Sequence, residues 1–148
     1  MCLIEKLKIY EGTKEYQAHM GYYRNGKFWV YKCSENKDTI GYGHLLKASE
    51  TFPNGINEDE ADKLLDKDIG IAKRNLSTLN LKLPQDWEDF MVIMIFQLGL
   101  SGTKKFKKMI IALLNNNYTE AIKQAKDSLW YRQTPNRLNQ MIKDLINK

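Results

Sequence analysis

The stretch Cys33–Leu46, which reads C-S-E-N-K-D-T-I-G-Y-G-H-L-L, decides the fold prediction for this chain. Its second half, Thr39–His44, predicts a short strand that breaks at two glycines and ends on an imidazole. Glycines that alternate with apolar residues let the backbone approach a ligand or another segment closely. Polar side chains with chemical uses gather in the same stretch, namely Cys33, Asp38, Thr39 and His44. We therefore expect this strand and turn to carry functional groups.

The composition bounds the class of protein. With 148 residues, of which 43% are hydrophobic and 28% charged, the chain is expected to form a single globular domain with its own core. No apolar run is long enough to span a bilayer, and the first residues are charged, so we expect neither a membrane span nor a cleaved secretion signal. Cys2 and Cys33 are too few for a disulfide framework and are expected to be reduced thiols.

The net charge of +5 favours polyanionic partners, which include nucleic acids and anionic polymers of the bacterial envelope. The densest basic run, Lys104–Lys108, is typical of the solvated start of a helix. No paired helix-turn-helix signal accompanies it, so we expect no nucleic-acid partner. Two histidines and two cysteines at unrelated spacings make no metal or cofactor constellation, so none is expected.

Residues 3–11 predict a first helix, because Leu3, Leu7 and Tyr10 fall on one face and Gly12 is a plausible residue to end it. Glu11 should then be the last helical residue, at the border of an apolar stripe. A carboxyl in that setting tends to have a raised pKa. The alternative is a surface carboxylate at a helix end, and the sequence favours neither.

Asn25-Gly26 lies between aromatic-rich runs and predicts a two-residue type I′ turn. We expect strands near 16–24 and 27–33, followed by a third at 38–42, in one small antiparallel sheet. From residue 57 the chain is expected to be helical. Asn57 and Glu60 have the spacing of a capping box ahead of a long helix over 58–78.

Asp68 falls within the buried face of this long helix, where a carboxylate needs a partner. His44 is the best candidate, since the only other histidine is His19. A helix over 85–98 is apolar nearly all round and should run through the core. Gln97 within it needs hydrogen-bond partners from a neighbouring backbone or a ligand. Further helices are expected over 104–115, 118–126, 128–132 and from Thr134-Pro135 through 146.

The predicted fold class is therefore α+β, with a small antiparallel sheet in an N-terminal lobe and a mostly helical C-terminal lobe. We expect a β-rich lobe over 12–56, an interlobe helix over 58–78, and a helical lobe formed by 79–148 together with helix 1–11. A cleft between two such lobes is the expected place for a ligand.

Five ordered blocks of the chain resemble the phage lysozyme family, glycoside hydrolase family 24, and in particular its T-even-phage branch. The blocks are Glu11-Gly12, T-I-G-Y-G-H-L-L at 39–46, Glu60–Asp68, F-Q-L-G at 96–99, and D-S-L-W-Y-R-Q-T-P-N-R at 127–137. The resemblance implies a lysozyme-like fold and a muramidase. Its expected reaction is hydrolysis of the β-1,4 bond between N-acetylmuramic acid and N-acetylglucosamine in peptidoglycan, with inversion.

The resemblance also implies roles for individual residues. Glu11 would be the general acid, Thr39 would hold the attacking water, and Cys33 stands at the family's second acidic position. A thiol has an ordinary pKa of about 8.5, so only a small fraction is ionised at pH 7. Either a Cys33 thiolate works in the site, or the nearby carboxylates supply the charge there (Glu35 and Asp38).

Supporting residues follow from the same blocks. His44 would pair with Asp68 and tie the lobes together, and Arg137 would neutralise or orient Glu11. The remaining matched positions would bind substrate or support the site, and they are Leu45, Phe96, Gln97 and Tyr131.

Residues 12–32 separate Glu11 from Cys33, about thirteen more than the family has. This insertion could form a flap over substrate, a docking surface for another protein, or a lid that blocks the cleft. The alternative function is accordingly a catalytically weak or inactive module that binds cell wall or a phage structural partner. A cysteine hydrolase that uses Cys33 and His44 is disfavoured, because no third group is evident to orient them.

As a lysozyme of this kind, the protein is expected to be a monomer that acts on peptidoglycan. It would either stay in the host cytoplasm until a holin opens the membrane, or be carried in the tail of the virion.

Overall fold

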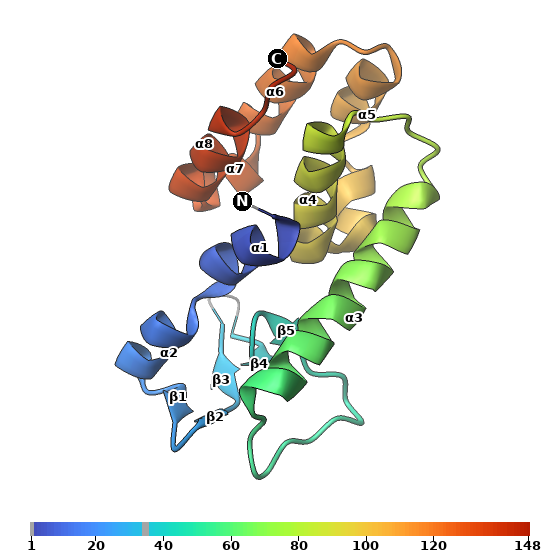
Figure 1. Cartoon of the computed structure of the whole chain (residues 1–148). Helices are drawn as coiled ribbons and strands as arrows, with labels where there is room; N and C mark the ends of the chain where they lie inside the picture. The colour runs from blue at the N-terminus through green and yellow to red at the C-terminus, as the bar shows by residue number, and fades with distance from the viewer. Residues whose placement is uncertain (1, 34–35) are drawn as a thin grey trace. The chain divides into compact units, whose positions relative to one another are not determined.

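The computed structural model describes residues 2–33 and 36–148, in which the chain forms two compact units (Figure 1). The first unit is Met1–Gly70 and the second is Ile71–Lys148. Short antiparallel sheets occur in the first unit, and the second is helical. This arrangement confirms the predicted α+β, lysozyme-like fold class.

The first unit opens with two helices. Helix α1 (Leu3–Glu11) has the predicted bounds and ends at Gly12, whose φ is 107°. Helix α2 (Lys14–Met20) was not expected, and the predicted strand over 16–24 is wrong in its first half. Thr13 caps α2 by accepting from the Tyr16 backbone N–H at 3.1 Å, and Gly21 ends it in the left-handed conformation. The aromatic content suggested a strand, but caps at both ends make the segment a helix.

The Asn25-Gly26 turn joins strands β1 (Tyr23–Arg24) and β2 (Lys27–Phe28). Both turn residues have positive φ, 55° and 74°, as a type I′ turn requires. The hairpin does not continue into the next sheet, so the prediction of one sheet is wrong. At the end of the hairpin, Phe28 exchanges two backbone hydrogen bonds with Ile56 at 2.7 and 2.9 Å. This pairing with a distant segment separates the hairpin from the second sheet.

The second sheet has the order β3–β4–β5, with strands Tyr31–Lys32, Asp38–Ile40 and His44–Leu45. Tyr31 lies opposite Thr39, and Thr39 lies opposite Leu45. The third predicted strand over 38–42 therefore ends at Ile40, because residues 41–43 form the turn to β5.

Helix α3 (Glu58–Ser77) begins with the predicted capping box. The Glu60 N–H donates to Asn57 Oδ1 at 2.8 Å, and the Asn57 N–H donates to Glu60 Oε1 at 3.1 Å. The core of the first unit includes residues from α1, from α3, and from the strands and turns: Leu7, Phe28, Ile40, Tyr42, Ile56, Ala61 and Leu65. The turn between β4 and β5 is part of this core, since Tyr42 packs edge-on against Phe28 at a centroid distance of 5.2 Å.

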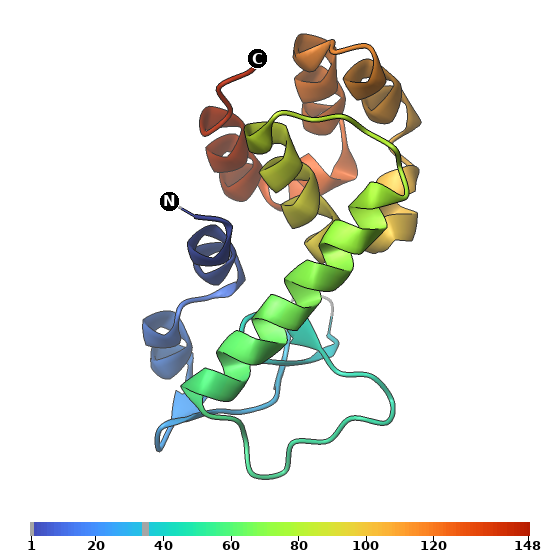
Figure 2. The same ribbon diagram turned by 45° about the vertical axis from the view of Figure 1, so that its right-hand side comes forward.

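The second unit consists of helices α4 to α8 after the end of α3. Their bounds are Gln85–Lys104, Lys107–Leu114, Tyr118–Lys126, Leu129–Gln133 and Pro135–Lys143. Helix α4 is interrupted at Gly99, one residue beyond its predicted end, by a backbone with φ 74° and ψ 168°. Helices α5 and α6 pack side by side (Figure 2).

The last helix differs in part from its prediction. Pro135 occupies the first turn of α8 as expected, but the helix ends at Lys143 and not at 146. Thr134 does not cap it with its side chain, because the hydroxyl donates to the Trp130 carbonyl at 3.0 Å.

The core of the second unit is built around α4. Residues 91–95 are all buried, as their apolar run predicts. Trp87 stacks on Tyr118, and its indole N–H donates to the Asn147 carbonyl at 2.8 Å. Within the described part of the chain, no helix combines the length and apolar character needed to cross a membrane.

Candidate active site

Glu11 lies where α1 meets the turn between β4 and β5. The Glu11 side chain lies against Gly43: a Cβ at Gly43 would be 2.7 Å from Oε2 and 3.0 Å from Cδ of Glu11. Gly43 also has a φ of 79°, which disfavours any side chain. The predicted close approach at the glycines is thus made by another segment, the end of α1. The Oε1 atom of Glu11 is buried.

Gly41, the other glycine of this turn, lies close to helix α3. A Cβ at Gly41 would touch Ala61 at the start of α3 and Ile56, both at 3.4 Å. The φ of Gly41 is 63°. The turn is therefore packed on one side against α3 and on the other against Glu11.

Thr39 stands in the middle of β4 and is 1% exposed. Its hydroxyl donates to the Lys37 carbonyl at 3.0 Å. Since the single hydroxyl proton is used there, the oxygen can only accept a hydrogen bond from a further partner. Leu45, directly opposite in the sheet, is 46% exposed and provides an apolar surface beside this position.

Cys33 follows β3 and is half-buried, Cys2 is exposed, and neither cysteine forms a disulfide. Its backbone pairs with Lys37 and Asn36 in the turn toward β4. Burial, together with the nearby negative charges of Glu11 and Cys33, raises the pKa of Tyr31 to about 12. Tyr31 therefore lies near both Glu11 and Cys33. Glu35, the other carboxylate considered for this place, lies outside the described residues, and Asp38 is exposed and paired with Lys32.

His44 is buried between two carboxylates. Its Nδ1 lies 2.7 Å from Asp68 Oδ2, the expected partner, and its Nε2 lies 3.1 Å from Glu50 Oε1. The hydrogen bond to Asp68 raises the pKa of His44, burial opposes this, and Glu50 adds to the increase. Two carboxylates at the two ring nitrogens favour the imidazolium form, in which both nitrogens donate.

Sequence reasoning missed Glu50 and Gln17. The Lys47 N–H donates to Glu50 Oε1 at 2.8 Å, and this local hydrogen bond holds the Glu50 carboxylate next to His44. The spacing of three residues between Lys47 and Glu50 was the signal in the sequence that could have indicated this hydrogen bond. Gln17 Nε2 donates to the carbonyls of Gly12 and Gly41, and no sequence pattern indicated this contact.

The other predicted residues belong to the second unit. Gln97 Oε1 accepts from the Trp130 indole N–H at 3.0 Å, so one partner of Gln97 is a side chain, which the sequence did not indicate. Tyr131 donates its hydroxyl to Asn139 Oδ1 at 2.9 Å. Phe96 and Arg137 are half-buried.

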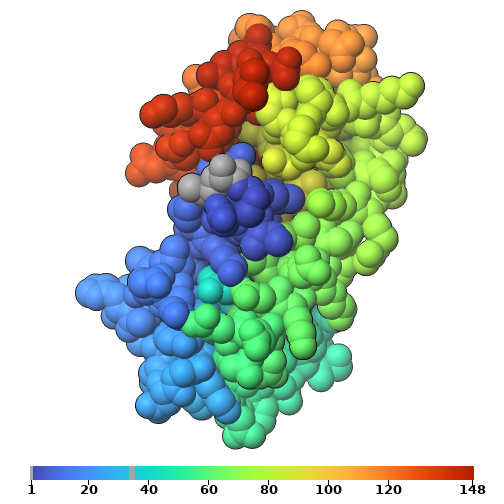
Figure 3. Space-filling view, in the orientation of Figure 1, coloured from blue at the N-terminus to red at the C-terminus, as the bar shows by residue number. Residues whose placement is uncertain are grey.

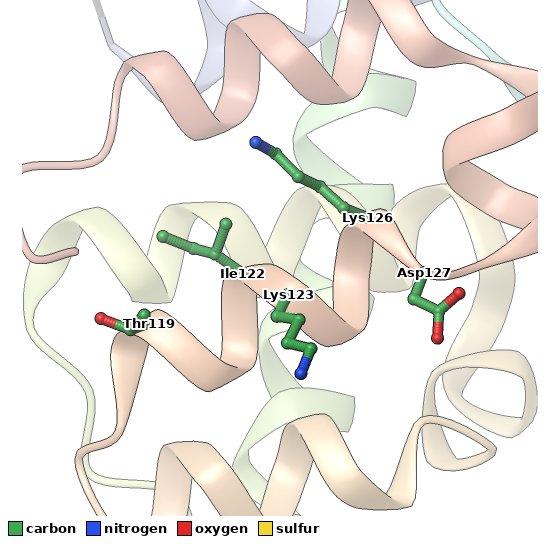
Figure 4. Close-up of a pocket in the computed structure, with 5 residues that line it drawn as sticks. All are labelled: Thr119, Ile122, Lys123, Lys126 and Asp127. Carbon is green, nitrogen blue, oxygen red and sulfur yellow. The ribbon is translucent and has the colours of Figure 1, made fainter.

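A hollow of about 440 Å³ lies along α6, away from all predicted residues. Its lining comes from α6 and the residue after it: Thr119, Ile122, Lys123, Lys126 and Asp127 (Figure 4). The two lysines point away from each other, so the hollow lacks the convergent polar groups of a binding site.

The α+β fold is of the lysozyme type. The model of the phage lysozyme family matches residues 25–147, and the chain therefore belongs to this family. The matched range includes Cys33, Thr39 and His44 but starts after Glu11.

Known proteins with similar sequences carry related names. The chain is 29% identical to "Probable T4-type lysozyme 1" of Dictyostelium discoideum, over 93% of this chain and 85% of that protein. It is also 29% identical to "Probable T4-type lysozyme 2" of the same organism, over 78% of this chain and 84% of the relative. Identity to "Pre-baseplate central spike protein Gp5" of Enterobacteria phage T4 is 27%, over 76% of this chain but only 24% of that protein.

Proposed function

We propose that this protein is a muramidase that cleaves the β-1,4 bond between N-acetylmuramic acid and N-acetylglucosamine, with inversion, during lysis of a bacterial cell wall by a phage. The observation that carries the proposal is the packing of the Glu11 carboxylate on Gly43. It joins the candidate acid to the turn of the Thr39–His44 stretch. Membership of the phage lysozyme family supports the same reaction class.

Glu11 acts as the general acid in this proposal. Glycoside hydrolysis requires a proton on the leaving oxygen as the glycosidic bond breaks. The Oε1 atom of Glu11 is buried and Oε2 lies against the turn at Gly43, so the carboxyl group is held in one place from which it can donate its proton.

Thr39 positions the attacking water. Because its hydroxyl donates to the Lys37 carbonyl, it accepts a hydrogen bond from the water and leaves a lone pair of that water free to attack. Attack from the face opposite the leaving group gives inversion. The exposed Leu45 beside Thr39 is the proposed apolar contact for the sugar ring.

Cys33 takes the role of the second acidic group. As a thiolate it either stabilises the positive charge that develops at the anomeric carbon or accepts the proton of the water. Its position near Tyr31, which also lies near Glu11, supports a place in the same site.

The remaining assignments rest on the sequence blocks. Arg137 orients Glu11, and Phe96, Gln97 and Tyr131 contact substrate or support the site. The pair of His44 and Asp68 fixes the start of β5 on α3 and so keeps the turn in place. In this proposal residues 1–148 work as one lysozyme domain, with 58–78 as the interlobe helix.

Two routes to the wall agree with the proposal. A monomer could be released from the host cytoplasm by a holin, or the protein could be part of the virion tail. The similarity to a phage baseplate spike protein favours the second route. Mass spectrometry of purified virions distinguishes them, since copies in the virion indicate a tail protein and their absence indicates release by a holin.

The experiment is digestion of purified Gram-negative peptidoglycan. After borohydride reduction, new ends that carry reduced N-acetylmuramic acid identify a muramidase, and reduced glucosamine ends would contradict the proposal. Proton NMR of the first-formed anomer tests inversion. In the alternative function, favoured by a cysteine at the acidic position, the wild-type protein binds the polymer without cleaving it and Glu11→Gln changes nothing.

A further inference from the structure

We propose that Gln17 is a positioning residue that holds the general acid in place through the backbone on both sides of it. The proposal rests on the proposed role of Glu11. Gln17 Nε2 donates one hydrogen bond to the Gly12 carbonyl and one to the Gly41 carbonyl, both at 2.9 Å. These two bonds use both protons of the amide nitrogen.

The two carbonyls bracket the contact between Glu11 and Gly43. Gly12 is bonded directly to Glu11, and Gly41 begins the turn that ends in Gly43. The Glu11 carboxylate occupies the space in which a side chain at Gly43 would lie. One amide therefore ties the end of α1 to the turn at the point where acid and turn meet.

The side chain of Gln17 is buried, unlike those of its neighbours on α2. It is 1% exposed, whereas its neighbours on α2, Tyr16 and Met20, are 55% and 44% exposed. Figure 3 shows the α2 segment at the surface of the first unit. Its Oε1 atom is buried and accepts no hydrogen bond from the described residues. A reversed amide would place this oxygen against two carbonyl oxygens, so the two donations determine its orientation.

This contact gives part of the insertion a role that differs from a flap, a docking surface or a lid. Helix α2 lies within residues 12–32, and its one deeply buried side chain, Gln17, contacts the backbone of Gly12 and Gly41. Loss of the amide would free Gly12 and Gly41 to move apart. A small displacement of a catalytic group can reduce turnover by about a hundredfold.

The test is steady-state kinetics on soluble peptidoglycan fragments with Gln17→Met, which keeps the length of the side chain and removes both donors. We expect kcat to fall by about ten- to a hundredfold and KM to change by less than about twofold, because the substrate contacts remain. Gln17→Asn, which keeps an amide on a shorter side chain, should give an intermediate kcat and provides a readout if Gln17→Met does not fold. Gln124→Met, in α6 of the second unit, is the matched control and should keep wild-type kcat.

Circular dichroism and the unfolding temperature identify a merely structural effect. If Gln17→Met and Gln17→Asn are less stable but keep wild-type kcat below their unfolding temperatures, while Glu11→Gln is inactive, the positioning role is wrong and the proposed function stands. If Glu11→Gln is as active as the wild type, the proposed function fails, and the positioning role fails with it.

Discussion

The Oε2 atom of Glu11 lies so close to Gly43 that a single methyl group cannot fit between them, since a Cβ there would be 2.7 Å from the oxygen. The two residues are far apart in the sequence and come from α1 and from the turn before β5. Their contact explains why the turn needs glycine. It also makes Gly43 a sensitive position for the chemistry proposed for Glu11.

Gly43→Ala should displace the Glu11 carboxylate and lower kcat by about tenfold or more. The positive φ adds a cost of about 1–2 kcal/mol to the free energy of unfolding. Gly26→Ala is the matched control, because Gly26 has a φ of 74° and no atom within 4 Å of a new Cβ. It should lose similar stability and keep its activity. Equal kcat values for the two variants would contradict the account.

The pairing of His44 predicts a pH dependence of stability. Its hydrogen bond to Asp68, opposed by burial and assisted by Glu50, raises the pKa of His44 above the ordinary 6.5. A raised pKa stabilises the folded state fully below about pH 6.5 and loses this contribution as the pH rises through the folded value.

His44→Gln should therefore cost about 2 kcal/mol at pH 6 and flatten the decline in the free energy of unfolding above about pH 6.5. Urea titrations at a series of pH values measure this. His19→Gln removes the other histidine, which is exposed, and should leave the wild-type slope. The same decline in His44→Gln as in the wild type would show that another group titrates.

Cys33 is expected to contribute as a thiolate. Cys33→Ala should lower kcat by about tenfold or more, and Cys33→Asp should keep lysis, because a carboxylate supplies the negative charge at neutral pH. Cys2→Ala is the control, since Cys2 is an exposed free thiol. Wild-type turnover in Cys33→Ala would remove the thiolate role.

Gln97 should matter for stability as well as for any contact with substrate. Gln97→Leu leaves the buried indole N–H of Trp130 without its acceptor, at a cost of about 1–3 kcal/mol. Gln140→Leu removes a glutamine whose hydrogen bond to Asp144 is exposed and should cost less than about 0.5 kcal/mol. Denaturation midpoints that fall equally in the two variants would argue against this role of Gln97.

Local sequence signals predicted the parts of the fold that local interactions determine. Helix α1, the Asn25-Gly26 turn and the capping box of α3 each depend on residues a few positions apart, and all three were predicted from the sequence. The strand expected from residue 16 was wrong because aromatic content outweighed a cap at Thr13 that lacks the usual acidic partner. The division into two sheets depends on the pairing of Phe28 with Ile56, which no local pattern reveals.

In the candidate site, too, only some of the contacts could be predicted from the sequence. The partnership of His44 with Asp68 could be predicted, because a buried carboxylate needs a cation and the chain has only two histidines. Glu50 reaches the same ring through a loop whose path the sequence does not define. The contact of Glu11 with Gly43 and the amide of Gln17 depend on how the turn packs on α1 and α2. Such tertiary packing has no signature in residue spacing.

The most direct test of the central claim is the rate at which wild type and Glu11→Gln release reducing N-acetylmuramic acid ends from peptidoglycan. The two proteins should be compared at equal concentration, with matched circular dichroism spectra. Glutamine keeps the shape of the side chain but has no acidic proton, so we predict a loss of at least about a hundredfold. A Glu11→Gln rate within about twofold of the wild-type rate would contradict the assignment of Glu11 as the general acid.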